Sequence, residues 1–277
     1  MNNIISSDFY RVRRGAALRN TCLGLLLVVA FIMITLLVMQ SDKVPDMLAT
    51  TNNLTPAEEA ELRQSMQESI TVVENGAEFG LEVLAESIIF MFFLPIAIAV
   101  FCADFTAGTY RNTLSYESNR TKVYMAKLLL SIGLCLAMVI GTVIVSLILG
   151  AFAFGFSGIT TAAVGKLLIV ILLQLPIYLA TITVCHCLAS ITKKSSMTIA
   201  FFLVGYFVLT LIVQLMVGAF SLPEWLMVIE PQSAGKIAAS FETASVKDIV
   251  ILIAYYMGVS VIAVLLGAGY YKKSDMP

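Results

Sequence analysis

The chain holds few residues that could carry out chemistry. Its one histidine, His186, lies between Cys185 and Cys187 in VCHCL, a composition that can bind a transition metal. Three consecutive side chains on a helix point in different directions, however, so we expect no metal site. The sequences GKLL at Gly165 and GKIA at Gly235 lack the upstream glycine and the Ser or Thr of the phosphate-binding G-x-x-x-x-G-K-[ST] motif. We therefore expect no ATP site, no cofactor and no enzymatic activity in this chain itself.

The composition is that of a membrane protein. Hydrophobic residues make up 59% of the 277 and charged residues 13%, whereas soluble domains have about 45–50% and about 25%. A membrane span needs about 20 apolar residues, and six stretches qualify, with no cleavable signal before the first. We predict an all-α protein forming a single transmembrane domain over residues 1–277, with spans near residues 22–39, 83–103, 128–150, 167–190, 197–220 and 249–270.

Basic residues indicate the orientation, because they gather in cytoplasmic loops. Of the 17 lysines and arginines, 12 fall on the side that holds both termini and 5 on the other. We therefore expect both termini in the cytoplasm of a multi-pass protein of the cell membrane. The net charge of −1 gives no indication of a nucleic-acid partner. The 12 are Arg11, Arg13, Arg14, Arg19, Arg111, Arg120, Lys122, Lys127, Lys193, Lys194, Lys272 and Lys273, and the 5 are Lys43, Arg63, Lys166, Lys236 and Lys247.

The first external loop, residues 41–82, is strongly acidic. Ten Asp and Glu residues lie between Asp42 and Glu86, against only Lys43 and Arg63. The sequence TPAE at residues 55–58 has the pattern of a capping box with proline at the first helical position, so we predict a helical cap. Such a cap could attract cationic cargo or gate an exit. The interpretation we favour is that the loop is acidic because basic residues stay inside.

The stretch DFTAGTYRNTLSYESNRTKVYMAK, residues 104–127, is polar and basic between two apolar spans. Asp104 and Thr106 can cap a helix over about residues 106–116. Two interpretations are open at this point. The stretch could be an ordinary loop that obeys the positive-inside rule, or a short helix exposed to the cytosol for docking a partner.

The order of residues in this stretch resembles that of a known family. Permeases of type-2 ATP-binding-cassette (ABC) exporters carry, after their second span, an acidic residue, Gly-Thr, a basic residue, Leu-Ser and a later Arg and Lys. In that family the segment is a coupling helix that sits in a cleft of the ATPase subunit. The family often has Glu first and a proline before the arginine, where this chain has Asp104 and YESN. The resemblance implies ATPase-coupling roles for Asp104, Phe105, Gly108, Thr109, Arg111, Asn112, Leu114, Ser115, Arg120 and Lys127.

Two other segments agree with this resemblance, which covers the whole chain. Residues 1–21 combine apolar positions such as Ile4 and Val12 with several arginines, a pattern typical of an interfacial amphipathic helix. Residues 221–248 resemble the short external helices before the family's last span. The resemblance implies a separate cytoplasmic ATPase that binds ATP and Mg, a second permease as homodimer or heterodimer, and a bacterial membrane. Small six-span permeases of this family commonly serve peptide export or antimicrobial immunity.

Polar residues inside the spans suggest where a pathway could run. They share one face in each of two spans, and such groups either line a cavity or hydrogen-bond between helices; the sequence leaves both open. A weakly polar pathway suits a hydrophobic or amphipathic substrate such as a peptide, toxin or antimicrobial, with a lipophilic drug as the alternative. The candidates are Gln174, Tyr178 and Thr181 in the fourth span and Tyr206, Thr210 and Gln214 in the fifth.

Other classes of membrane protein fit less well. A secondary transporter or channel would need ion ligands near the midplane and often internal repeats, and we find neither. An intramembrane protease would need Ser/His, paired Asp or H-E-x-x-H, none of which the sequence offers. A non-transporting scaffold or sensor with a cytoplasmic docking helix stays open as an alternative.

Overall fold

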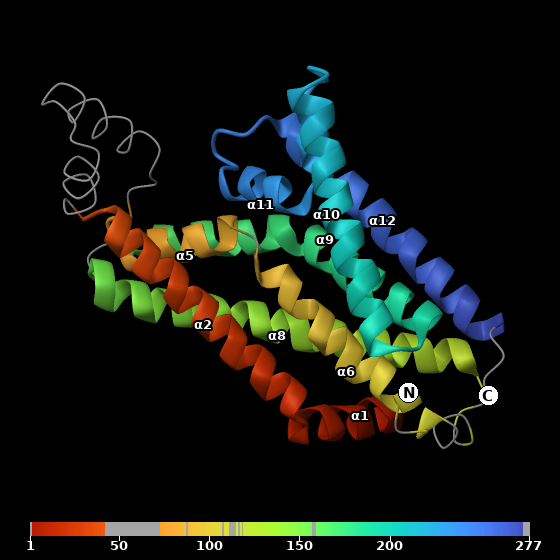
Figure 1. The fold of residues 1–277 in the computed structure, drawn as a ribbon. Coiled ribbons are helices and arrows are strands. Elements are labelled where there is room, and N and C mark those ends of the chain that lie inside the picture. Colours follow the sequence, from red (N-terminus) through yellow and green to blue (C-terminus); the bar gives the residue numbers. More distant parts are fainter. Residues whose placement is uncertain are drawn as a thin grey trace, which may run out of the picture.

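The computed structural model describes residues 2–41, 73–86, 88–106, 108–110, 115, 117, 119–156 and 159–273. The regular elements of this part are all helices (Figure 1). They are α1 (Asn2–Arg14), α2 (Ala16–Met39), α5 (Gly76–Ala85), η1 (Ile88–Phe92), α6 (Phe93–Thr106), α8 (Arg120–Phe154), α9 (Thr161–Thr192), α10 (Ser195–Gly218), η2 (Glu224–Ile229), α11 (Pro231–Ala239) and α12 (Val246–Lys273).

Six helical segments of the described part are long and apolar enough to cross a membrane, which confirms the predicted all-α, multi-span architecture. They are α2, Ile89–Thr106, α8, α9, α10 and α12, with mean hydropathies between 2.2 and 3.0. The second span differs from the prediction of one helix over residues 83–103. Helix α5 ends at Ala85, and a 3-10 turn leads into α6 at Phe93. Pro95 fits in the first turn of α6 because it has no N–H to satisfy there.

The flanking segments are helical where they are described. The amphipathic α1 is shorter than the predicted 1–21, because the chain turns at Gly15 and α2 begins at Ala16. Residues 221–248 contain η2 and α11, in agreement with the expected helical segment. Most of the acidic loop, including the capping box at 55–58, lies outside the described residues. Its last part is α5, whose Asn75 side chain accepts hydrogen bonds from the backbone N–H groups of Ala77 and Glu78.

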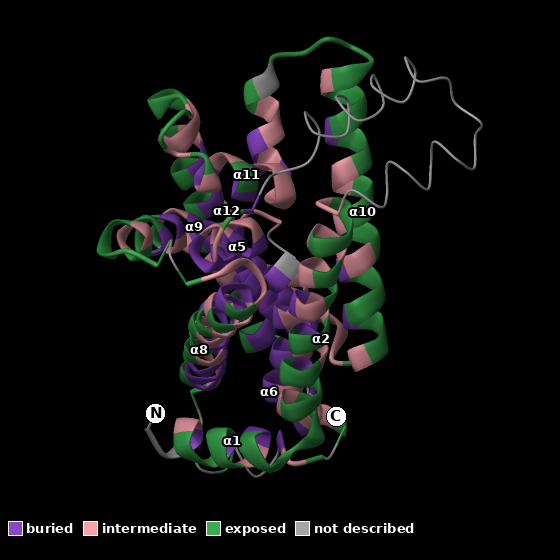
Figure 2. Cartoon of the chain, turned by 90° about the vertical axis from the view of Figure 1, so that its left-hand side faces the viewer, coloured by how far each residue is buried: buried purple, intermediate pink, exposed green. Residues whose placement is uncertain are grey.

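The buried core lies among α5, α6, α8 and α9, whereas α2 and α10 present mostly exposed apolar side chains (Figure 2). An exposed apolar helix is expected when lipid is the solvent. Helices α5 and α8 approach closely where both carry small residues. A Cβ atom added to Gly76 would lie 2.6 Å from the backbone N of Ala151, and one added to Gly150 would lie 2.9 Å from the Cα of Gly76. A larger residue at either position would collide with the opposite helix, so this crossing requires glycine at both.

Helix α1, the end of α6, the start of α8 and the end of α12 gather at one end of the molecule (Figures 1 and 2). The ring of Tyr271 near the end of α12 lies 5.4 Å from Phe101 of α6 and 6.1 Å from Tyr124 of α8, between centroids. Helix α12 approaches α8 with little room here, since a Cβ atom on Gly267 would overlap the Tyr124 hydroxyl. The polar stretch 104–127 thus begins and ends beside both terminal helices.

Candidate functional site

Four charged side chains meet at this end of the molecule; we call Asp8, Arg11, Asp104 and Lys127 the charge cluster. The Lys127 Nζ lies 2.8 Å from Asp8 Oδ2 and 2.5 Å from Asp104 Oδ2. The Arg11 guanidinium pairs with Asp104 Oδ1 and lies 3.0 Å from Asp8 Oδ1. The backbone carbonyl of Val100 accepts hydrogen bonds of 3.2 Å from both cations. The cluster has two positive and two negative groups, so it is formally neutral.

Three helices position these side chains. Asp8 lies on α1 between Ile4 and Val12, which are buried on the same face at i−4 and i+4. Asp104 occupies the last turn of α6, and Lys127 the second turn of α8. Asp104 and Lys127 are each only 3% exposed, whereas Arg11 is 34% exposed. The cluster therefore ties α1 to both ends of the stretch 104–127.

Burial determines what this cluster can do. Taking charges out of water costs several kcal/mol each unless they are paired, so breaking a buried pair is strongly destabilising. Among the described residues, no three His, Cys, Asp or Glu side chains could jointly hold a metal ion. The cluster is thus suited to fixing geometry and to transmitting a displacement between α1, α6 and α8.

A layer of aromatic residues lies next to the cluster. Phe101 packs edge-on against His186, with centroids 5.6 Å apart, and the His186 Nε2 lies 2.6 Å from the Ser131 hydroxyl of α8. His186 is fully buried and contacts neighbouring helices rather than solvent. This packing joins the C-terminal part of α9 to α6 and α8 next to the charge cluster.

The stretch between α6 and α8 is described in part. Helix α6 ends at Thr106, and Gly108 follows with φ +68°, a conformation that favours glycine and commonly ends helices. The Thr109 hydroxyl donates a 3.0 Å hydrogen bond to Asp104, and the ring of Phe105 stacks on Tyr110 at 5.4 Å. The helix predicted over residues 106–116 largely lies outside the described residues, as do the coupling candidates Arg111, Asn112 and Leu114.

The structure divides the other coupling candidates into two groups. Asp104 and Lys127 are buried within the chain, so they do not present a surface to another protein. Gly108 and Ser115 are exposed, and Phe105, Thr109 and Arg120 are partly exposed. The sequence analysis missed Asp8. The signal that could have found it is an acidic residue on the apolar face of an amphipathic helix, where an unpaired charge would be costly.

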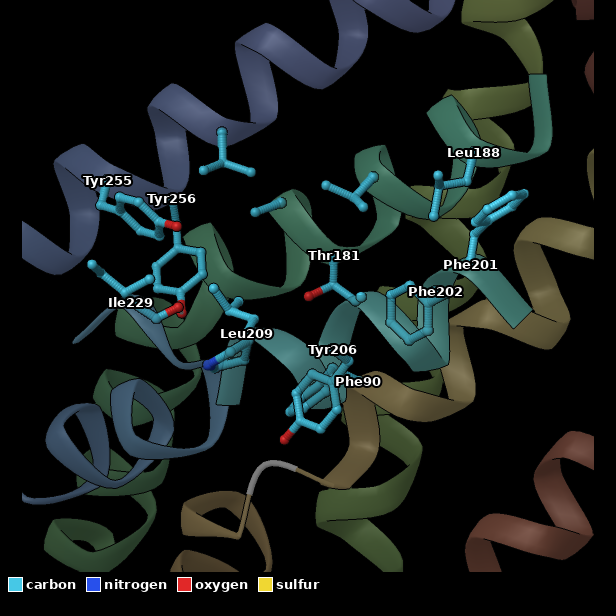
Figure 3. A pocket seen from close by; sticks show the side chains of 15 residues that line it. Phe90, Thr181, Leu188, Phe201, Phe202, Tyr206, Leu209, Ile229, Tyr255 and Tyr256 are labelled. Carbon is cyan, nitrogen blue, oxygen red and sulfur yellow. The ribbon is translucent and has the colours of Figure 1, made fainter. Parts of the chain in front are cut away.

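A second feature lies toward the opposite end, where η2 and α11 cover the helices. An apolar cavity of about 330 Å³ opens between η1, α9, α10, α11 and α12 (Figure 3). Its volume falls in the range of about 300–1,000 Å³ typical of ligand pockets. Aromatic side chains dominate the lining, and Thr181 contributes one of the few hydroxyl groups. The principal aromatic residues are Phe90, Phe201, Phe202, Tyr206, Tyr255 and Tyr256.

Two of the six predicted pathway residues, Thr181 and Tyr206, line this cavity. Gln174 is fully buried instead, and its Nε2 donates to the backbone carbonyls of Leu84 at 2.9 Å and Gly235 at 3.2 Å.

The Tyr178 hydroxyl donates to the side-chain oxygen of Gln174, so this pair joins α5, α9 and α11. Thr210 lies 3.5 Å from Glu230, and Gln214 is exposed. Of the predicted pathway residues, Thr181 and Tyr206 thus line a cavity, whereas Gln174 and Thr210 make hydrogen bonds to other segments.

Comparison with known proteins adds no identification. No protein-family model matches the sequence, and no curated protein matches it.

Proposed function

We propose that this chain is the transmembrane permease subunit of an ABC exporter, driven by a separate ATPase subunit. The observation that carries the proposal is the stretch 104–127, which leaves a span end and is anchored at both ends by the charge cluster. Asp104 and Lys127 hold the stretch against α1, while Gly108 and Ser115 are exposed at the same end of the molecule. A segment that is rigidly fixed to the spans and exposed to a partner is suited to transmitting movement.

In this proposal both termini and the stretch 104–127 face the cytoplasm of a bacterial cell, and η2 and α11 face outward. Two permeases and two ATPases assemble with two-fold symmetry. Closure of the ATPases on ATP and Mg moves the stretch, and the charge cluster passes this displacement to α1 and to the spans α6 and α8. The residues that touch the ATPase come from the exposed part of the stretch, whereas Asp104 and Lys127 act as positioning residues.

The cavity supports a hydrophobic or amphipathic cargo. Its lining is apolar and aromatic, and it lies on the membrane-spanning helices α9, α10 and α12. A peptide, toxin or antimicrobial with apolar side chains would bury them there by the hydrophobic effect. Thr181 and Tyr206 supply the polar contacts that orient such a molecule.

The test is co-purification. The chain would be expressed with a candidate P-loop ATPase subunit, and complex formation and ATP hydrolysis would be measured for the wild type and Arg111→Glu. We expect the variant to lose both, since it reverses a charge in the docking stretch. Arg13→Glu, a charge reversal at an exposed position of α1, is the matched control and should retain both. Absence of any co-purifying ATPase, or wild-type behaviour of Arg111→Glu, would favour the scaffold or sensor alternative.

A further inference from the structure

Glu230 is a buried carboxylate that forms no ion pair within the part of the chain that the structure describes. The side chains of formally charged residues that are buried in the described part are Asp8, Asp104, Lys127 and Glu230, and the first three belong to the charge cluster. Glu230 is 3% exposed, and among the described residues no ion pair reaches it. A buried charge is normally paired because isolation from water is costly. Glu230 is thus the exception that calls for a counter-charge.

Two hydroxyl groups contact this carboxylate. The Ser233 hydroxyl donates to Oε2, and the Thr210 hydroxyl lies 3.5 Å from Oε1. The nearby cation of α11, Lys236, is directed elsewhere, since its Nζ lies 3.2 Å from Glu86 Oε1. Neutral donors therefore hold the Glu230 carboxylate in place, and no cation among the described residues pairs with it.

Glu230 lies at the edge of the aromatic cavity. Its two neighbours in sequence, Ile229 and Pro231, both line the cavity. Thr210, which contacts the carboxylate, follows Tyr206 by one helical turn on α10. On the far side, the Tyr256 hydroxyl donates a 3.1 Å hydrogen bond to the carbonyl of Ile229 (Figure 3). Glu230 therefore lies beside the cavity, although it is not itself one of the residues that line it.

The chemistry of the lining complements the carboxylate. Tyr and Phe rings present a negative π face that attracts cations, most strongly where water is excluded. Tyr206, Tyr255 and Phe90 supply such rings from three different elements, α10, α12 and η1. An aliphatic lipid tail would fill the cavity but leave Glu230 unpaired, and an anion would be repelled by it. A positive charge on a bulky apolar body satisfies both features together.

We propose that this cavity is a binding site for a lipophilic organic cation, with Glu230 as its counter-ion and the aromatic rings enclosing its apolar body. This deepens the proposed function by naming the substrate class, and it rests on that function only for the statement that the bound cation is transported. Binding itself requires no ATPase, so the two can be tested apart.

The decisive probe is a pair of ions with nearly the same shape and opposite charge. The full chain, purified alone and placed in lipid nanodiscs, would be dialysed to equilibrium against radiolabelled tetraphenylphosphonium or tetraphenylborate, with empty nanodiscs subtracted. We expect the phosphonium to bind saturably. Glu230→Gln, which keeps the shape and removes the charge, should raise its Kd by at least about tenfold and should not weaken retention of the borate.

Three further variants separate charge from packing. Gly205 lines the cavity on α10, and a Cβ atom there would meet nothing within 4 Å. Gly205→Leu should therefore fill the cavity and abolish phosphonium binding without breaking the helix. Gly218→Leu makes the same change in open space on the same helix and should bind as wild type. Ser233→Ala removes a hydrogen bond to Glu230 but keeps the charge, so the preference for the cation should persist.

Two results would overturn the proposal. One is equal retention of phosphonium and borate by the wild-type chain. The other is an unchanged phosphonium Kd in Glu230→Gln, provided that this variant elutes and unfolds like the wild type. If the chain binds phosphonium but recruits no ATPase, the cation site is supported and the exporter function is refuted. If the chain forms an active complex with an ATPase but does not bind phosphonium, the exporter function is supported and the cation site is refuted.

Discussion

The charge cluster allows a quantitative test of how the end of the bundle is held together. Lys127→Met removes one cation and leaves Asp8 and Asp104 to share Arg11, so that one buried negative charge is uncompensated. Breaking a buried ion pair in this way costs about 3–5 kcal/mol. On the scale of about 2–4 °C per kcal/mol that holds for large domains, the Tm should fall by roughly 10 °C.

A second variant tests the electrostatic reason for this loss. Asp104→Asn combined with Lys127→Met removes one charge of each sign and leaves the Asp8–Arg11 pair, whose atoms lie 3.0 Å apart. The double variant should be more stable than the sum of the two single variants predicts, by about 0.5–3 kcal/mol, because residues in contact couple.

The assay is thermal unfolding in detergent, followed by the fluorescence of the tyrosines and of Trp225, the one tryptophan. Lys122→Met is the matched control on α8. The Lys122 side chain is 59% exposed and its ammonium lies 3.9 Å from Glu117, so loss of this charge should cost at most about 1 kcal/mol. The reasoning is refuted if Lys127→Met unfolds at the control's temperature, or if the single-variant losses simply add.

Two further predictions concern the α5 region. Glu82 is partly buried beside Glu86, and burial, followed by this repulsion, raises its pKa above 4.5, although Lys236 opposes the shift. A raised carboxyl pKa disfavours the folded state at neutral pH, and this penalty disappears as the pH falls through the folded pKa toward 4.5. Glu82→Gln should therefore raise the Tm at pH 7 and lose this gain near pH 4.5, whereas the exposed Glu242→Gln should change little at either pH; an equal gain at both pH values would contradict this. Separately, Gly150→Ala should destabilise by about 1–3 kcal/mol because its methyl group would lie 2.9 Å from the Cα of Gly76. Gly141→Ala on the same helix meets no atom within 4 Å and should be neutral or stabilising, by up to about 1 kcal/mol; thermal unfolding compares the two, and equal effects would show that the crossing is not tightly packed.

The amino-acid sequence by itself determined the class of the protein and the order of its helices. Hydropathy adds up along a continuous stretch, so each span could be recognised without knowledge of its neighbours. The amphipathic α1 was likewise predicted from local pattern, whereas the helices before the last span were expected from the family resemblance. Boundaries were less accurate, because the turn at Gly15 and the break between α5 and α6 depend on how these segments pack against the spans.

The tertiary structure alone decided the partners of the polar residues. Asp104 and Lys127 were predicted to face another protein, yet they pair with each other, and Lys127 also pairs with Asp8, which is 119 positions away. Gln174 was considered for a pathway, yet it bonds to backbone carbonyls of two other helices. Nothing in the sequence singled out Glu230, one acidic residue in a segment predicted to be external. An ion pair or a cavity depends on the angle and rotation with which helices cross, and these follow from packing between segments distant in sequence, which a local pattern does not encode.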